Sequence, residues 1–222
     1  MMAAQQYEVT AHPRAVKQFF SGAIFVAVLI GGWLYPVLGY FIPLCMLLGM
    51  GFAFFRGRKW CDWYCPRGSF YDAWVKGMSP QREIPRLLKR FSFRLGALLV
   101  LMTTMTVNLV IRWPNPFAMG KVFVVMLTAT TVAGIILALV LHPRSWCTFC
   151  PIGTVSHGIG AKRYPLYINS DLCIDCKACG KVCPMQIKPY AFKAKGRVTV
   201  DDGDCIKCNL CVAVCPKRAL AR

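Results

Sequence analysis

A run of four cysteines followed by proline occurs twice near the C-terminal end of this chain, with the spacing C-x2-C-x2-C-x3-C-P. The two runs are Cys173, Cys176, Cys179, Cys183, Pro184 and Cys205, Cys208, Cys211, Cys215, Pro216. Three thiolates this close in sequence can wrap three corners of one inorganic cube, and the proline, which lacks a backbone N–H, then turns the chain away. The doubled run predicts a small α+β domain of the two-cluster bacterial ferredoxin kind, over residues 171–222, with two [4Fe-4S] clusters.

The ligands are expected to cross between the runs, because the fourth cysteine of such a run ligates the other cluster. The predicted sets are Cys173, Cys176, Cys179 and Cys215 for cluster one, and Cys205, Cys208, Cys211 and Cys183 for cluster two. Structural zinc is the alternative, since C-x2-C pairs also bind zinc. A zinc site closes with four ligands and has no use for a third C-x2 step followed by C-x3-C-P, so the pattern favours clusters.

The rest of the chain is too apolar for an ordinary soluble protein, with 56% hydrophobic and only 16% charged residues overall. Four stretches, 17–34, 37–55, 93–111 and 122–141, are each long enough to cross a bilayer core of about 30 Å. The fold class is therefore a membrane all-α domain of two helical hairpins (17–153), with a 16-residue N-terminal segment, a linker (154–170) and the ferredoxin domain. The short turn at Pro36 predicts that the first two helices are antiparallel neighbours, and a second turn is expected over 112–121. No cleavage site follows the first apolar stretch, so we expect it to remain as an anchor.

The formal net charge of +18 is better explained by membrane orientation than by nucleic-acid binding, because no nucleic-acid motif accompanies it. The loop between the second and third spans holds nine basic residues: Arg56, Arg58, Lys59, Arg67, Lys76, Arg82, Arg86, Lys89 and Arg90. The two short turns hold only Arg112 and Lys121. The positive-inside rule predicts a multi-pass protein of the cell inner membrane, with both termini and the ferredoxin domain in the cytoplasm. The basic tail suits contact with anionic lipid heads or with an acidic partner.

A second repeat follows the second and fourth spans, where both segments read R-x-W-C and then, after two or three residues, C-P-x-G. We expect the two hairpins to be related by an axis along the membrane normal, which brings both loops together. Our hypothesis is that Cys61, Cys65, Cys147 and Cys150 hold a third centre, most simply another [4Fe-4S] cluster. The alternatives are a redox-active dithiol, a zinc clip or plain packing. Cys45 remains, and we expect it to be a packing residue.

The histidines offer no buried bis-histidine haem site, so a membrane carrier would be a quinone bound without haem. The polar candidates for its headgroup are Thr103, Thr104, Thr106 and Asn108, although hydrogen bonds between helices are their more ordinary role. Arg94 is expected to snorkel to the interface. The aromatic residues Trp60, Trp63, Trp146 and Phe149 are expected in an interfacial belt.

Four spans, a pair of Cys-Pro loops and a C-terminal two-cluster ferredoxin resemble the NapH, MauN and NosR group of membrane iron–sulfur proteins. The resemblance covers 17–216 and implies that Cys61, Cys65, Cys147 and Cys150 form the membrane-face redox motif. It also implies electron transfer from the quinol pool, or from cytoplasmic donors, towards a redox enzyme. The second loop is one residue shorter than C-x3-C-P. The large extracytoplasmic domain of the NosR type is missing, so we expect any extracytoplasmic partner to be a separate polypeptide.

The leading hypothesis is a non-haem electron-transfer subunit that passes single electrons between the quinone pool, or a cytoplasmic donor, and a partner oxidoreductase in a complex. Such a subunit would not itself transform a metabolite. Two alternatives stay open: a maturation factor that reduces a metal during assembly of a respiratory enzyme, and a membrane redox sensor.

Overall fold

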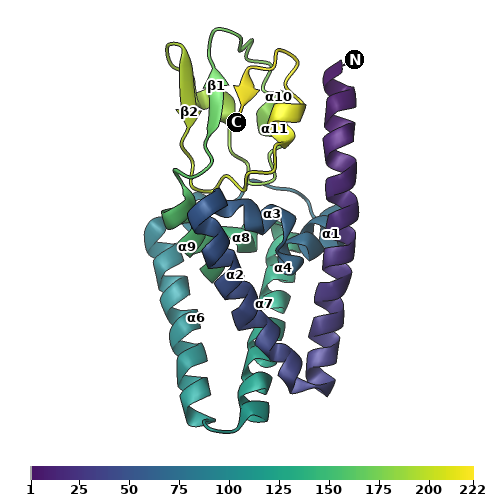
Figure 1. The fold of residues 1–222 in the computed structure, drawn as a ribbon, viewed down its shortest axis with the longest axis vertical. Helices are drawn as coiled ribbons and strands as arrows, with labels where there is room; N and C mark the ends of the chain where they lie inside the picture. Colours follow the sequence, from purple (N-terminus) through teal and green to yellow (C-terminus); the bar gives the residue numbers. More distant parts are fainter. Residues whose placement is uncertain (1) are drawn as a thin grey trace.

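The computed structural model describes residues 2–222, with side chains from Pro13 onward, so Met1 of the predicted N-terminal segment lies outside the described residues. Four helices are long and apolar enough to cross a membrane, which confirms a multi-pass membrane protein. They are α1 (Met2–Leu34), α2 (Phe41–Arg56), α6 (Phe91–Ile111) and α7 (Pro116–Val140). The cysteine-rich tail caps one end of these helices (Figure 1).

The first two spans do not pack along each other as predicted, and they diverge from the turn η1 (Pro36–Tyr40) (Figure 1). Instead, η1 packs tightly on α7. A Cβ added to Gly39 would lie 2.3 Å from the carbonyl oxygen of Gly120, and one added to Gly120 would lie 2.3 Å from that of Pro36. Small residues allow this close backbone contact, which replaces the expected α1–α2 contact with one between η1 and α7.

The fourth span begins six residues earlier than predicted, so the turn before it is shorter than the expected 112–121. The Asn115 side chain accepts hydrogen bonds from the backbone N–H groups of Phe117 (3.1 Å) and Ala118 (3.2 Å). Pro116 occupies the first helical position, where its missing N–H costs nothing. This capping signal starts the helix at Pro116 although the continuous apolar run begins later.

Short helices join the spans on the side that carries the ferredoxin-like tail. Between α2 and α6 lie η2 (Gly57–Lys59), α3 (Trp60–Trp63), α4 (Pro66–Phe70), η3 (Tyr71–Val75), η4 (Lys76–Met78) and α5 (Arg86–Lys89). After α7 come α8 (Ser145–Phe149) and α9 (Pro151–Gly160). The first half of the predicted linker is therefore helical, and α9 packs on α2.

The tail is built on a three-stranded antiparallel sheet of order β2-β1-β3. Its elements are β1 (Leu166–Asn169), α10 (Ala178–Lys181), η5 (Pro189–Phe192), β2 (Arg197–Val200), α11 (Leu210–Ala213) and β3 (Leu220–Ala221). Tyr167 pairs with Thr199 on one side and with Ala221 on the other. The central strand thus lies within the segment that the sequence suggested was linker.

Candidate metal centres

The eight tail cysteines divide between two cavities, and each cavity collects one of the predicted ligand sets. One is lined by Cys173, Cys176, Cys179 and Cys215, and the other by Cys183, Cys205, Cys208 and Cys211. Among the described residues, no group of three or more His, Cys, Asp or Glu side chains gathers closely enough for a single metal ion. Thiols spread around a cavity suit a cubane better than a zinc ion, whose four ligands converge on one atom.

The backbone of the two runs has the same unusual conformation at equivalent positions, 32 residues apart. The left-handed residues are Asp175, Lys177 and Gln186 in the first run, and Lys207, Asn209 and Arg218 in the second. Positive φ is rare for such residues and clusters at functional sites. The backbone N–H of Ile187 donates to Cys183 Sγ (3.4 Å), and that of Ala219 donates to Cys215 Sγ (3.3 Å). The two loops therefore present their thiols in the same way.

The four membrane-face cysteines come together where the short helices meet the tail. Cys61 and Cys147 lie in α3 and α8, whereas Cys65 and Cys150 precede the prolines that start α4 and α9. Cys65 and Cys150 line one cavity, and Arg144 Nη1 contacts both the carbonyl oxygen of Cys61 (2.8 Å) and the Sγ of Cys147 (3.8 Å). Cys61 belongs to the same buried apolar cluster as Cys208. The four sulfurs thus lie between the tail and the spans.

Each Arg of the R-x-W-C repeats crosses to the other repeat. Arg58 donates to the backbone carbonyl of Cys147 (2.8 Å), and Arg144 donates to that of Cys61 (2.8 Å). Both arginines are almost fully buried. The glycines of the two C-P-x-G segments make room: a Cβ on Gly68 would lie 2.9 Å from Arg144 Nη1, and one on Gly153 would lie 2.9 Å from Arg58 Nη2. The reciprocal contacts hold the two cysteine loops together.

Two buried carboxylates anchor this arrangement on the side of the first span. Asp72 accepts from Arg144 Nη2 (2.7 Å) and from Arg14 Nη2 of α1 (2.7 Å), and Asp62 accepts from Arg14 Nη2 (2.6 Å). Gln18 of α1 also donates to Asp72 (3.1 Å). The start of the membrane portion of α1 is thereby tied to the first cysteine loop.

A second buried ion cluster joins the tail to the spans and consists of Asp204, Arg58, Arg94 and His157. Asp204, which directly precedes Cys205, accepts from Arg58 Nη1 (2.6 Å) and Arg94 Nη2 (2.6 Å), and lies 3.2 Å from His157 Nδ1. Burial alone would raise the pKa of Asp204, but the hydrogen bonds from His157 and Arg94 and the charge of Arg58 lower it below its ordinary value. Arg94 is 2% exposed, so it does not snorkel as predicted.

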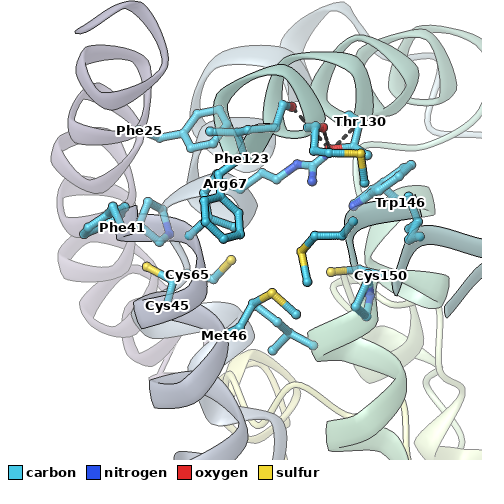
Figure 2. Close-up of a pocket in the computed structure, with 18 of the residues that line it drawn as sticks. Phe25, Phe41, Cys45, Met46, Cys65, Arg67, Phe123, Thr130, Trp146 and Cys150 are labelled. Atoms are coloured by element: carbon cyan, nitrogen blue, oxygen red, sulfur yellow. Dashed lines mark hydrogen bonds between the residues drawn. The ribbon is translucent and has the colours of Figure 1, made fainter. Parts of the chain in front are cut away.

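An apolar cavity of about 140 Å³ lies beneath the membrane-face cysteines, within the spans (Figure 2). Cys65 and Cys150 both line it, with Phe25, Phe123 and Trp146. Cys45 lines it too. An engineered apolar cavity of about 150 Å³ accepts benzene, so this space is suited to a single aromatic ring.

Among the side chains that the structure describes, Arg67 is the one cation in the wall of this cavity. It donates to the carbonyl oxygen of Thr130 and to the Tyr71 hydroxyl (3.3 Å), and its guanidinium lies 4.5 Å from the centre of the Trp146 ring. No carboxylate among the described side chains forms a salt bridge with it. From the sequence, Arg67 was considered only as one of the basic residues in the loop between the second and third spans. Its position directly after Cys65-Pro66 is the feature that could have linked it to the cysteine site.

The polar residues that the sequence suggested for a quinone headgroup do not line this cavity. Thr103, Thr104 and Thr106 are exposed on α6, and the Asn108 side chain donates to the Thr104 carbonyl of its own helix (2.8 Å). The cavity wall from α6 is instead formed by Leu101, Met102 and Met105. Trp146 and Phe149 are 5% and 7% exposed, so they pack in a core rather than in the predicted belt.

Two family descriptions match the chain. A "4Fe-4S dicluster domain" matches residues 166–221, and a "4Fe-4S binding domain" matches residues 38–91 and 123–165, which contain the membrane-face cysteines. No solved structure gave a significant match.

Curated relatives bear related names. The methylamine utilization ferredoxin-type protein MauN of Paracoccus denitrificans is 30% identical over 78% of this chain and 64% of its own length. The ferredoxin-type protein NapH of Haemophilus influenzae is 28% identical over 60% of this chain and 50% of its own length. The chain thus spans between half and two thirds of the length of these relatives. Its cysteine-lined cavities, its four spans and these matches support an iron–sulfur protein that is similar to the ferredoxin-type proteins NapH and MauN.

Proposed function

We propose that this protein relays single electrons between a quinone in the membrane and a redox partner on the ferredoxin side. The observation that carries this proposal is the order of the sites: two cysteine-lined cavities in the tail, four cysteines at the membrane face, then an apolar cavity within the spans. We also propose that the chain divides into the units that the sequence predicts. These are a membrane unit of two related hairpins, a connecting segment and a dicluster ferredoxin unit.

The residues fit the clusters that this function requires. Cys173, Cys176, Cys179 and Cys215 would hold cluster one, and Cys183, Cys205, Cys208 and Cys211 would hold cluster two. When bound, a [4Fe-4S] cluster supplies one-electron redox chemistry. The protein buries three of these ligands, since Cys179, Cys208 and Cys211 are each less than 10% exposed.

Cys61, Cys65, Cys147 and Cys150 would hold a third cluster. The reciprocal bonds of Arg58 and Arg144 support this assignment, because they fix both loops against each other, and Arg144 Nη1 also lies 3.8 Å from Cys147 Sγ.

Iron and sulfide analysis of anaerobically purified protein tests the third centre. We expect about twelve iron atoms per chain, and about eight in the Cys61→Ser/Cys147→Ser variant, since each cubane holds four. Cys45→Ser is the matched control and should keep the wild-type iron content. Iron for only two cubanes in the wild-type protein would remove the third centre from the proposal.

The apolar cavity supports a quinone headgroup as the membrane reactant. Its volume suits one ring, and the guanidinium of Arg67, which forms no salt bridge with any described carboxylate, can donate to a quinone oxygen. Cys65 and Cys150 line the same space, so the headgroup would lie directly beside the third centre.

Binding of a short-chain quinone analogue to the protein in lipid nanodiscs tests this site. Arg67→Gln should weaken binding by about tenfold, the effect expected from loss of one charge-assisted hydrogen bond of about 1.5 kcal/mol. Thr103→Val, on the lipid-exposed side of α6, should leave the affinity unchanged. If Thr103→Val weakened binding and Arg67→Gln did not, the site would lie on the outer surface of α6.

A further inference from the structure

The two cysteine runs of the tail have the same backbone conformation, but only one of them is covered. In the second run, Ile206 is 2% exposed and Lys207 is 1% exposed, because this loop faces the membrane portion. A Cβ on Gly57, at the end of α2, would lie 3.3 Å from Lys207 Cε. The loop of the second run is thus already an interface between the tail and the spans.

The equivalent loop of the first run is exposed and is not covered by the spans. Ile174, which corresponds to Ile206, is 58% exposed, and Leu172, which corresponds to the buried Asp204, is 48% exposed. Cys176 is exposed, whereas its counterpart Cys208 is buried. Two large apolar side chains beside a candidate cluster ligand are unusual on a solvated surface and typical of an interaction site.

Basic residues surround this apolar spot. We call the set Leu172, Ile174, Lys177, Pro216 and Lys217 the distal face, since all five line the cavity of cluster one and are exposed. Arg218 beside it is also exposed. The acidic residues nearby are Asp175, whose carboxylate is paired with Lys193 Nζ (2.5 Å), and the exposed Asp171. The distal face therefore carries a positive rim around an apolar centre.

We propose that the distal face is the docking surface for a small, acidic, soluble electron-carrier protein. Apolar contact at the centre and complementary charge at the rim are the features of transient interfaces that form quickly and dissociate quickly. The docking serves a balanced exchange: the carrier's centre loses one electron and cluster one gains it, or the reverse, with no bond formed or broken. The inference rests on the proposed cluster one, but it does not depend on the third centre or on quinone binding.

Equilibrium binding of an oxidised plant-type [2Fe-2S] ferredoxin, an acidic protein, provides the test. The full chain is held in nanodiscs of zwitterionic lipid, so that no anionic lipid competes for the basic residues. Lys177→Glu/Lys217→Glu should lower the affinity by about tenfold at low ionic strength, and the difference should shrink as salt screens the charges. Ile174→Ser should lower the affinity severalfold at every ionic strength, because its contribution is apolar.

The matched control is Lys162→Glu/Arg163→Glu, which changes the net charge by the same amount between α9 and β1, at exposed positions. At 0.1 M salt this control should stay within about twofold of wild type while Lys177→Glu/Lys217→Glu still binds more weakly, since charges beyond a Debye length of about 10 Å are then largely screened. Chemical reduction by dithionite and the EPR signals of both tail clusters should be unchanged in every variant. Equal loss of affinity in the two charge variants, or unchanged binding in Lys177→Glu/Lys217→Glu, would overturn the proposal.

Discussion

At the scale of single residues, the glycine of each C-P-x-G segment is as constrained as the cysteines. A Cβ at Gly153 would lie 2.6 Å from the carbonyl oxygen of Cys147, which is backbone and cannot move aside easily. We expect Gly153→Ala to destabilise the protein by about 1–3 kcal/mol, the usual cost of overpacking, and to lower its iron content. The measurements are thermal unfolding in detergent and iron analysis.

Gly158→Ala is the matched control on the same helix, because an added Cβ there meets nothing within 4 Å. Alanine is the better helix former, so this variant should be equal to wild type or more stable by up to about 1 kcal/mol. Similar destabilisation by both substitutions would mean that α9 tolerates no change, and the specific role of Gly153 would be lost.

Residue-scale prediction from the sequence reaches furthest where the chemistry is local. The tail cysteines could be sorted into two sets because their spacing encodes the loop that holds them, and the two cavities collect the same sets. The bonds of Asp204 to Arg58 and Arg94 join residues more than 100 positions apart, and no local pattern reports them. The prediction for Arg94 was wrong for this reason, since the side chain of an arginine near the start of a membrane helix ordinarily extends to the membrane interface.

At the scale of elements, the four spans could be predicted from length and hydropathy. Which elements pack against each span could not be predicted in this way. The short turn after α1 suggested an α1–α2 pair, whereas the Gly39–Gly120 contact joins η1 to α7. Strand β1 was missed because its pairing partners, β2 and β3, are about 30 and 50 residues away. Four residues of such a strand carry little signal by themselves.

The Asp204 ion cluster holds the tail against the spans, and its loss should loosen that contact. Asp204→Asn leaves Arg58 and Arg94 buried without their carboxylate, which typically costs about 3–5 kcal/mol. We expect faster hydrogen exchange in α9 and in the Gly203–Cys205 segment, together with protease cleavage between α9 and β1. Asp201→Asn, at an exposed position three residues away, is the control and should exchange like wild type. Unchanged exchange in Asp204→Asn would show that apolar contacts alone fix the tail.

At the scale of the whole molecule, the short helices between α2 and α6 and the tail with its doubled cysteine run lie at the same end of the spans (Figure 1). The segment between α2 and α6 carries eight Lys or Arg, whereas the turn between α6 and α7 contains only Arg112. The positive-inside rule therefore predicts that the ferredoxin-like tail lies in the cytoplasm. This orientation would give an acidic cytoplasmic carrier access to the distal face.

Epitope tags test this orientation without substitution of any cysteine. Tags placed after Arg222 and after Gly77, where an added side chain meets nothing within 4 Å, should bind antibody only in inside-out vesicles. A tag placed after Arg112, in the turn between α6 and α7, should bind antibody only in right-side-out vesicles or cells. The Gly77 tag is the internal control, because four spans require it to share a side with the C-terminus. Antibody access to the Arg222 tag from outside would reverse the orientation, and would place the distal face where a cytoplasmic carrier cannot reach it.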